Sequence, residues 1–539
     1  MTRRTILWTL LGLILLVAVG LRLHGITARG LWLDEVLSWK LQTFPVNLMI
    51  QRTGEPTTTH PPLYFLILHV WTRLFGDSAA VMRGLSVVFG IATLPAMFLL
   101  LKTFGHLLRQ DDSTNHGEND EKTTTAALLA CIFLATSNLH IHQAQQVRGY
   151  TLAAFLTVIS SVFLIRGLAW AKHMRVIWAA YTGSAIALIY THNLGLFSVV
   201  AQGLFAVLYL WAPGAVKRMR GGNDRVVLRR ARLLFSVSVL IVTVVYLPWL
   251  TRSLGQSGKL RTSWSKPVTA ETIPVEVEQA LTGTSTERVF QPTSGSWSFL
   301  AGLVVLGLLL VVLCGWPGVF LFLTGAVPPL LIYVYSLYSQ RSIFDARYLM
   351  FAQQMWLAGA AWLVSRIPSR PERICAALIP ASWLVFWCFD VQSTRAATAE
   401  PGIRAAVAHV VQHRRAEEIV IAETPFVFFG AQYYARNDCL VRVCAAERDR
   451  FLLNGESQLL PSDIVTPGDV ANSPPAGIWV VTSTSYMNIA KSQSPTNCVA
   501  PSAAWKLEET LEFAQDLYWE QPVEIRHYVR VDAERAVGR

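Results

Sequence analysis

Long apolar runs with few charges alternate with short polar segments over most of the chain. After Met1-Thr2-Arg3-Arg4, residues 6–21 are apolar, and the later runs have similar lengths. Each run is close to the roughly 20 residues that a helix needs to cross about 30 Å of hydrocarbon. The pattern therefore predicts about eleven membrane-spanning helices, the first of them an uncleaved span. The later runs lie at residues 81–101, 124–139, 150–170, 177–190, 194–211, 233–250, 299–313, 318–337, 348–364 and 374–389.

The distribution of positive charge orients these spans. The most basic segment, residues 213–232, carries seven Lys and Arg side chains. Because loops rich in Lys and Arg stay in the cytoplasm, this segment is placed inside. Counting spans back from it places Arg3 and Arg4 inside only if the apolar stretch 61–75 does not cross, so we expect that stretch to be a helix at the outer interface. Counting forward places everything after about residue 390 outside.

The pattern changes to shorter alternating elements near residue 392. Residues 403–412 read as a helix, 418–423 as a strand, and 426–434 as a helix or loop. Further strand patterns occur at 477–482, 505–513 and 523–531. We therefore expect a polytopic α-helical membrane domain at residues 1–391 and a small extracytoplasmic α/β domain at 392–539. Within the first domain, residues 22–78 form an outer loop that contains two adjacent acids and the interfacial helix.

Composition agrees with a membrane protein. Of the 539 residues, 53% are hydrophobic and only 15% are charged, whereas soluble domains carry about 25% charged residues. This excludes a disordered chain and a single soluble domain. The net charge of +11 indicates that basic loops orient the protein in the membrane and contact anionic lipids, rather than that the protein binds nucleic acid. The seven cysteines include no CxxC pair, and a disulfide among Cys439, Cys444 and Cys498 in the outer domain is left open.

Three polar residues of the outer loop are candidates for chemistry. Asp34 and Glu35 follow a bulky apolar triplet just beyond the first span. They are typical either of a helix N-terminus, where the dipole favours acids, or of a carboxylate held at the membrane surface as a general base. His60 precedes Pro61-Pro62, which favours a helix start there, and its alternative reading is a capping or surface histidine.

At this point the chain resembles a known family. It carries, in order, RGLWLDEVLSW, HPPLYFLILHVWTRLFGDS and RGLSVVFGIATLPAMFLL, then QQVRGY at 145–150, YTHN at 190–193 and RYL at 347–349. These motifs, spread over about residues 25–365, resemble bacterial polyprenyl-phosphate-sugar glycosyltransferases of the GT-C fold (family 39, protein mannosyltransferase-like and aminoarabinose-transferase-like membrane proteins). Two positions depart: Gln146 stands where the family has glutamate, and Phe351 replaces a proline. The WWDYG signature of oligosaccharyltransferases is absent from the sequence.

The resemblance implies a glycosyltransferase of the cell (inner) membrane. It would move a sugar from a polyprenyl-phosphate donor to the hydroxyl of a lipid, glycan or protein acceptor at the outer face. Asp34 would be the general base and Glu35 its support, with the two roles open to exchange. Tyr150 and His192 could instead serve only in packing. Arg341 and Arg347 could instead form a salt bridge with Asp345. The residues implied to bind the donor phosphate or sugar are His60, Arg148, Tyr150, His192, Arg341 and Arg347.

No cofactor is required by the resemblance. Gln146 takes the place of an acid that could have held a metal. Whether the protein uses a divalent cation is therefore left open. The histidines near the outer face (His60, His140, His142 and His192) have no zinc-site spacing, so no metal ligand is assigned. The alternative function is a polytopic transporter or lipid flippase with an outer binding domain. That alternative predicts charges buried mid-span and two similar halves, whereas the runs here are nearly free of charge.

Overall fold

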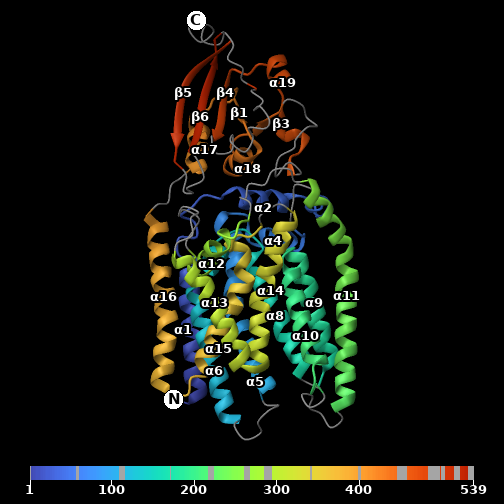
Figure 1. The fold of residues 1–539 in the computed structure, drawn as a ribbon. Helices are drawn as coiled ribbons and strands as arrows, with labels where there is room; N and C mark the ends of the chain where they lie inside the picture. Colours follow the sequence, from blue (N-terminus) through green and yellow to red (C-terminus); the bar gives the residue numbers. More distant parts are fainter. Residues whose placement is uncertain are drawn as a thin grey trace.

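The apolar runs form a bundle of long helices, and the C-terminal segment forms a sheet domain at one end of it (Figure 1). The computed structural model describes residues 2–55, 60–108, 116–169, 172–215, 224–259, 268–283, 294–339, 343–397, 402–445, 458–483, 498, 504–514 and 522–531. The chain begins at the end of the bundle that lies farthest from the sheet domain (Figure 1). We call the opposite end, next to the sheet domain, the domain-facing end.

Each predicted span coincides with a helix. Among the described residues, seven helices are long and apolar enough to cross a membrane, and α6 with α7 makes an eighth as a broken span. The remaining predicted runs form α9, α10 and α15, which are shorter or more polar. The polytopic helical fold class is therefore confirmed. The helices are α1 (Arg3–Leu23), α5 (Ala79–Leu108), α6 (His116–Thr136), α8 (Tyr150–Ala169), α9 (Met174–Thr191), α10 (Gly195–Trp211), α11 (Asp224–Lys259), α13 (Ser294–Leu313), α14 (Gly315–Ser339), α15 (Met350–Ser365) and α16 (Arg370–Ala397).

A break between α6 and α7 (Asn138–Ala144) shapes the domain-facing end of the bundle. The two helices meet at an angle of 61°. Arg22, fully buried at the end of α1, donates to the carbonyl oxygens of Leu134 and Ala135 at 3.1 and 3.2 Å. These carbonyls lie in the last turn of α6, so the guanidinium satisfies backbone acceptors that a helix end leaves open. The break lets the chain turn back toward residues 145–149, which carry part of the candidate site.

Short helices cover the domain-facing end. They are α2 (Leu33–Thr43), α3 (Val46–Thr53), α4 (Leu63–Phe75) and α12 (Thr272–Thr282). With 13 residues, α4 is shorter than a membrane span, as expected for the stretch 61–75. Sequence analysis did not predict α12. The polar composition of residues 110–122, which are low in apolar side chains, predicts a disordered loop. That prediction is wrong for 116–122 because α6 begins at His116, while 110–115 lie outside the described residues.

The C-terminal domain is a six-stranded sheet with order β3-β2-β1-β4-β6-β5. The first four strands in this order run parallel, and β6 is antiparallel to both β4 and β5. Helices α17 and α18 lie between the sheet and the bundle (Figure 1). The predicted helix 403–412 and the strands near 418, 477, 505 and 523 are confirmed, whereas β2 and β3 were not predicted. The elements are α17 (Gly402–His413), β1 (Ile419–Ala422), α18 (Pro425–Ala435), β2 (Val441–Cys444), β3 (Ile464–Val465), α19 (Pro467–Asn472), β4 (Gly477–Ser483), β5 (Trp505–Phe513) and β6 (Val523–Arg530).

One disulfide lies in this domain. Cys444 at the end of β2 is bonded to Cys498, with their Cα atoms 5.8 Å apart. Cys439 carries a free thiol. Of the pairings that sequence analysis left open, the structure therefore contains the one that excludes Cys439.

The orientation in the membrane generates the first prediction. We expect alkaline phosphatase fused after residue 539 to be active, because that enzyme matures only outside the cytoplasm and the sheet domain lies opposite the basic end of α11. The same reporter fused after Ala215, in the basic segment, should be inactive. Phosphatase activity is measured in intact cells, and the reverse pattern for the two fusions would contradict the topology.

Candidate functional site

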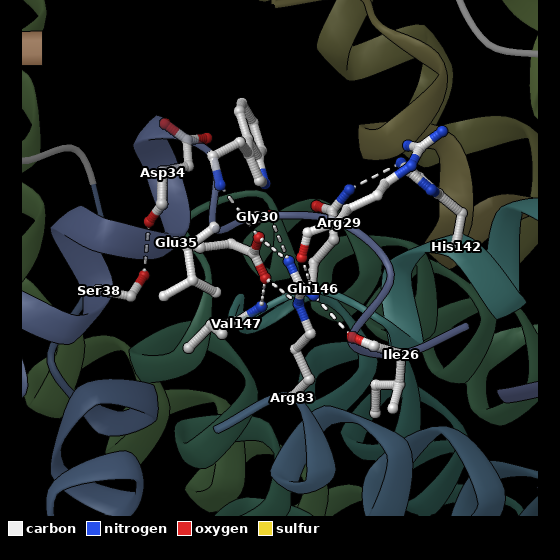
Figure 2. Close-up of polar contacts among 12 residues, drawn as sticks. Ile26, Arg29, Gly30, Asp34, Glu35, Ser38, Arg83, His142, Gln146 and Val147 are labelled. Carbon is white, nitrogen blue, oxygen red and sulfur yellow. Dashed lines mark hydrogen bonds and ion pairs between the residues drawn. The ribbon is translucent and has the colours of Figure 1, made fainter. Parts of the chain in front are cut away.

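Two adjacent acids in the first turn of α2 point to opposite sides. Successive residues of a helix are rotated by about 100°, so Asp34 and Glu35 cannot share a partner easily. Glu35 turns inward and its Oε2 accepts from the backbone N–H of Trp32 at 3.3 Å, which caps the helix start. Figure 2 shows the carboxylate of Glu35 facing Arg83, while that of Asp34 points away. The helix start therefore gives the two acids different environments.

Glu35 is fully engaged in a buried ion pair. Its side chain is 1% exposed and lies 2.6 Å from Nη2 of Arg83, on α5. Nε of Arg83 donates to Oε1 at 2.8 Å, and the backbone N–H of Val147 donates to the same oxygen at 2.9 Å. With the bond from Trp32, the carboxylate accepts four hydrogen bonds. Such saturation leaves no lone pair directed toward a substrate.

Arg83 also binds the loop that precedes α2. Its Nη1 donates to the carbonyl oxygens of Ile26 and Arg29 at 2.6 and 3.1 Å, and Nη2 donates to that of Gly30 at 2.9 Å (Figure 2). The guanidinium therefore ties α5 to the segment from which Asp34 projects. Arg83 begins the motif RGLSVVFGIATLPAMFLL, and no role is predicted for it from the sequence. Its position as a single arginine at the start of an apolar span could have indicated a buried partner.

Asp34 lies between two guanidinium groups. Its side chain is 24% exposed, and its Oδ2 is 3.5 Å from Nη2 of Arg148 and 4.0 Å from Nη1 of Arg347. Arg148 comes from the loop between α7 and α8, and Arg347 from the short helix η1 (Ala346–Leu349). Both distances exceed the 2.7–2.9 Å typical of a strong charged hydrogen bond. The carboxylate is thus held loosely and partly open to solvent.

Two neutral histidines complete this group. His60 accepts a hydrogen bond from Arg148 through Nε2, and its ring centre is 5.3 Å from that of His192. Burial, together with the positive charges of Arg148 and Arg347, lowers the pKa of His192 to about 3. Burial and the same cations also hold the pKa of His60 well below its usual value. Both rings are therefore uncharged at neutral pH.

The tautomer of His192 follows from its neighbours. The backbone N–H of Leu194 donates to Nδ1 at 3.2 Å, so the hydrogen of the neutral ring resides on Nε2. Nε2 is buried and has no hydrogen-bond partner within the part of the chain that the structure describes. This N–H is therefore a buried donor without an acceptor among the described residues.

Aromatic rings surround the same point. The ring centres of Tyr150 and Tyr348 lie 5.4 and 5.8 Å from that of His192. The guanidinium carbon of Arg347 is 5.2 Å from the ring centre of Tyr348. The structure therefore brings together Asp34, His60, Arg148, Tyr150, His192 and Arg347 from the predicted set. Glu35 lies beneath them, and Arg341 lies outside the described residues.

Two further acids stand behind Arg347. Asp345 accepts from the Arg347 backbone N–H at 3.0 Å and lies 3.3 Å from its Nη2, so this arginine has the salt bridge considered as its alternative as well as Asp34. Glu276 on α12 is buried and accepts from the backbone N–H of Ala346 at 2.7 Å. Burial, then repulsion by Asp345, raises the pKa of Glu276 to about 8. The sequence gives no reason to expect a role at this site for Glu276 rather than for Glu278, two positions later.

The position where the family has glutamate is engaged in a local contact. Nε2 of Gln146 lies 2.7 Å from Nε2 of His142 (Figure 2). Among the described residues, no group of three or more His, Cys, Asp or Glu side chains has the arrangement of a metal site. A divalent cation stays a prediction, and no step below depends on it.

Comparison with known proteins identifies the fold. No family model and no curated protein matches the chain. ArnT from Cupriavidus metallidurans bound to undecaprenyl phosphate has a TM-score of 0.56 at 12% identity, with 95% of this chain and 97% of ArnT covered. Its apo state has a TM-score of 0.57 at 13% identity, with the same 95% and 97% coverage. The oligosaccharyltransferase AglB from Archaeoglobus fulgidus, in complex with an inhibitory peptide and a dolichol-phosphate, has a TM-score of 0.51 at 10% identity, covering 96% of this chain and 75% of AglB.

These likenesses extend over the bundle and the sheet domain together, since 95% of the chain matches ArnT. At identities of 10–13% they concern the fold and not the residues. The chain has the GT-C fold of these membrane proteins, as the sequence motifs implied.

The environment of Glu276 predicts a pH-dependent stability. Its pKa is about 8 when folded and 4.5 in the reference state, so the folded protein binds the proton more tightly. The free energy of unfolding should therefore fall as pH rises from about 4.5 to about 8, and then level off. We expect Glu276→Gln to raise the Tm above pH 8 relative to wild type and to match it near pH 4.5. Thermal unfolding across this range measures it; Glu271→Gln, at an exposed position, should keep the wild-type slope.

The buried Glu35–Arg83 pair predicts a stability loss. Glu35→Ala leaves the Arg83 guanidinium buried without its counter-charge, which typically costs about 3–5 kcal/mol of unfolding free energy. Glu118→Ala, which removes an exposed acid paired with Lys122 on α6, is the control and should leave stability unchanged. Thermal unfolding in detergent compares the two. Equal stability of both variants would contradict the structural role of Glu35.

Proposed function

We propose that the protein is an integral membrane glycosyltransferase that moves a sugar from a polyprenyl-phosphate donor to an acceptor hydroxyl. The observation that carries this proposal is the half-buried Asp34 carboxylate between the guanidiniums of Arg148 and Arg347. It occurs in a chain with the fold of ArnT, whose structure was determined with undecaprenyl phosphate bound. A base beside two phosphate-binding cations is the minimum equipment for this reaction.

Asp34 is the better general base of the two acids. The carboxylate of Glu35 accepts four hydrogen bonds from fixed donors, so it cannot approach a substrate proton. The carboxylate of Asp34 makes only long contacts with the side chains of Arg148 and Arg347, and it is 24% exposed. In the proposed step, an oxygen of Asp34 takes the acceptor proton while the acceptor oxygen bonds to the anomeric carbon of the sugar.

The leaving group explains the two arginines. Breaking the bond between the anomeric carbon and the phosphate oxygen converts a phosphodiester of charge about −1 into a monoester of charge about −2. Cations that already face the phosphate stabilise this developing charge more than they stabilise the bound donor. Arg148 and Arg347 can do so by exchanging their long contacts with Asp34 for phosphate oxygens, which guanidinium groups bind with two hydrogen bonds.

The neutral residues would orient the donor. The Nε2 hydrogen of His192 is free to bond a phosphate or sugar oxygen. Tyr150 and Tyr348 offer ring faces against which a sugar can pack. His60 accepts from Arg148 and so directs that guanidinium. Arg341 keeps its predicted role as a further phosphate ligand. The sugar and the class of acceptor, whether lipid, glycan or protein, do not follow from these contacts.

The test is Asp34→Asn. The amide keeps the shape of the carboxylate but cannot take a proton, so transfer should fall by roughly 10²–10⁴-fold. Binding of undecaprenyl phosphate should survive or tighten, because one negative charge between two cations is removed. Transfer is measured in native membranes with a polyprenyl-phosphate-linked sugar, beside a binding assay for undecaprenyl phosphate on the purified protein.

Asp438→Asn, an exposed position at the end of α18, is the matched control and should behave as wild type. Wild-type sugar transfer by Asp34→Asn would exclude Asp34 as the general base. Loss of transfer in Glu35→Gln, with wild-type stability and an active Asp34→Asn, would assign the base to Glu35 instead. Absence of transfer and of phosphate binding in the wild type would exclude the proposed function.

A further inference from the structure

One peptide group upstream of Asp34 is held from two sides. The carbonyl oxygen of Gly30 accepts from Nη2 of Arg83 at 2.9 Å. The backbone N–H of Leu31, which belongs to the same peptide group, donates to the hydroxyl oxygen of Tyr434 at 2.7 Å. Because a peptide group is planar, bonds at both its oxygen and its nitrogen fix the orientation of the plane. The first bond comes from the bundle and the second from the C-terminal domain.

The approach of Tyr434 to this segment is close. A Cβ atom added at Gly30 would lie 3.3 Å from the Tyr434 hydroxyl, tighter than most real contacts. Leu31 is buried and belongs to a hydrophobic cluster that also contains residues of α2, α4, α18 and the sheet. Removing the hydroxyl would take away the acceptor that the Leu31 N–H has here.

The helix that carries Tyr434 is itself anchored on the bundle. Nζ of Lys40, on α2, donates to the side-chain oxygen of Gln432 at 2.8 Å and to Asp463 at 3.1 Å, with both charged side chains 7% exposed. The ring centre of Trp39 is 5.1 Å from that of Tyr433. These contacts attach α18 to α2. The helix that carries the Tyr434 hydroxyl is thus packed against the bundle.

A further link joins α18 to the segment between α4 and α5. Arg436 pairs with Asp77 at 2.5 Å, and the indole N–H of Trp39 donates to the same carboxylate at 3.1 Å. The hydroxyl of Tyr433 donates to the backbone oxygen of Asp77 at 3.3 Å. These bonds hold the interface but do not contact residues 30–35, which makes Tyr433 a matched comparison for Tyr434.

We propose that Tyr434 is a positioning residue for Asp34. Through the Leu31 N–H, the C-terminal domain sets the plane of the Gly30–Leu31 peptide group and hence the direction in which α2 begins. Asp34 lies three residues later in the first turn of that helix. The domain is therefore part of the machinery that places the base, beyond any part it has in acceptor binding. The inference rests on the proposed function in naming Asp34 as the base.

The consequence for catalysis is specific. A small rotation of the first turn of α2 displaces the Asp34 carboxylate from the acceptor hydroxyl, and a misplacement of about 1 Å can cost 10²-fold in rate. Donor binding should be retained, because Arg148 and Arg347 are held by other elements. Loss of the Tyr434 hydroxyl should therefore lower kcat and leave the KM for the donor near its wild-type value.

The experiment compares Tyr434→Phe with Tyr433→Phe in the full-length protein. Each variant loses one hydroxyl from the same helix and keeps its ring. We expect kcat to fall by about tenfold to a hundredfold in Tyr434→Phe, with donor KM and undecaprenyl-phosphate binding unchanged, and little change in Tyr433→Phe. Hydrogen–deuterium exchange of the peptide that contains Leu31 should be faster only in Tyr434→Phe.

Each other outcome opposes the inference. Equal kcat in both variants, or a rise in donor KM without loss of kcat, would overturn the positioning role. If the wild-type protein transfers no sugar with the donors used, the proposed function fails. Hydrogen–deuterium exchange at Leu31 then tests only whether the Tyr434 hydroxyl holds the Leu31 N–H. Unchanged exchange in Tyr434→Phe would then overturn that contact.

Discussion

The buried ion pair between Glu35 and Arg83 is the interaction on which the candidate site depends. It joins α2 to α5, and the same guanidinium binds three carbonyl oxygens of the preceding loop. Two charges taken out of water are stable only when nearly every donor and acceptor is satisfied. That condition leaves little freedom to the segment from which Asp34 projects. The Glu35 carboxylate also binds the Val147 N–H, so the loop that carries Arg148 is tied to the same point.

This arrangement divides the work between neighbouring acids. Asp34 and Glu35 have the same functional group and adjacent positions. The Asp34 carboxylate lies 3.5 and 4.0 Å from its two cations, whereas the Glu35 carboxylate accepts four hydrogen bonds. The difference comes from helix geometry, which turns successive side chains in different directions. The start of α2 therefore holds, in one dipeptide, both the carboxylate proposed as the base and the carboxylate that supports the loop.

Much of the fold could be predicted from hydropathy, and the site only in part. Long apolar runs must become helices in a bilayer, which is why each predicted span coincides with a helix. Strand β3 was not predicted because its two residues are too few for a period of two to show. The partners of Glu35 and Asp34 lie far away in sequence, so local spacing could not reveal that Arg83 supports the loop while Arg148 faces Asp34.

The contrast in contact lengths argues for two kinds of arginine. Arg83 contacts Glu35 at 2.6 and 2.8 Å, and both side chains are buried. If Arg83 exchanged this partner, the Glu35 carboxylate would be left as an unpaired buried charge. Arg148 and Arg347 meet Asp34 at 3.5 and 4.0 Å, beside a partly exposed carboxylate. Such contacts cost little to exchange, so in the proposed function the donor phosphate takes these guanidiniums while Asp34 stays in place. A rigid cation beneath the loop and two exchangeable cations above it are what the proposed site needs to admit an anion without displacing the proposed base.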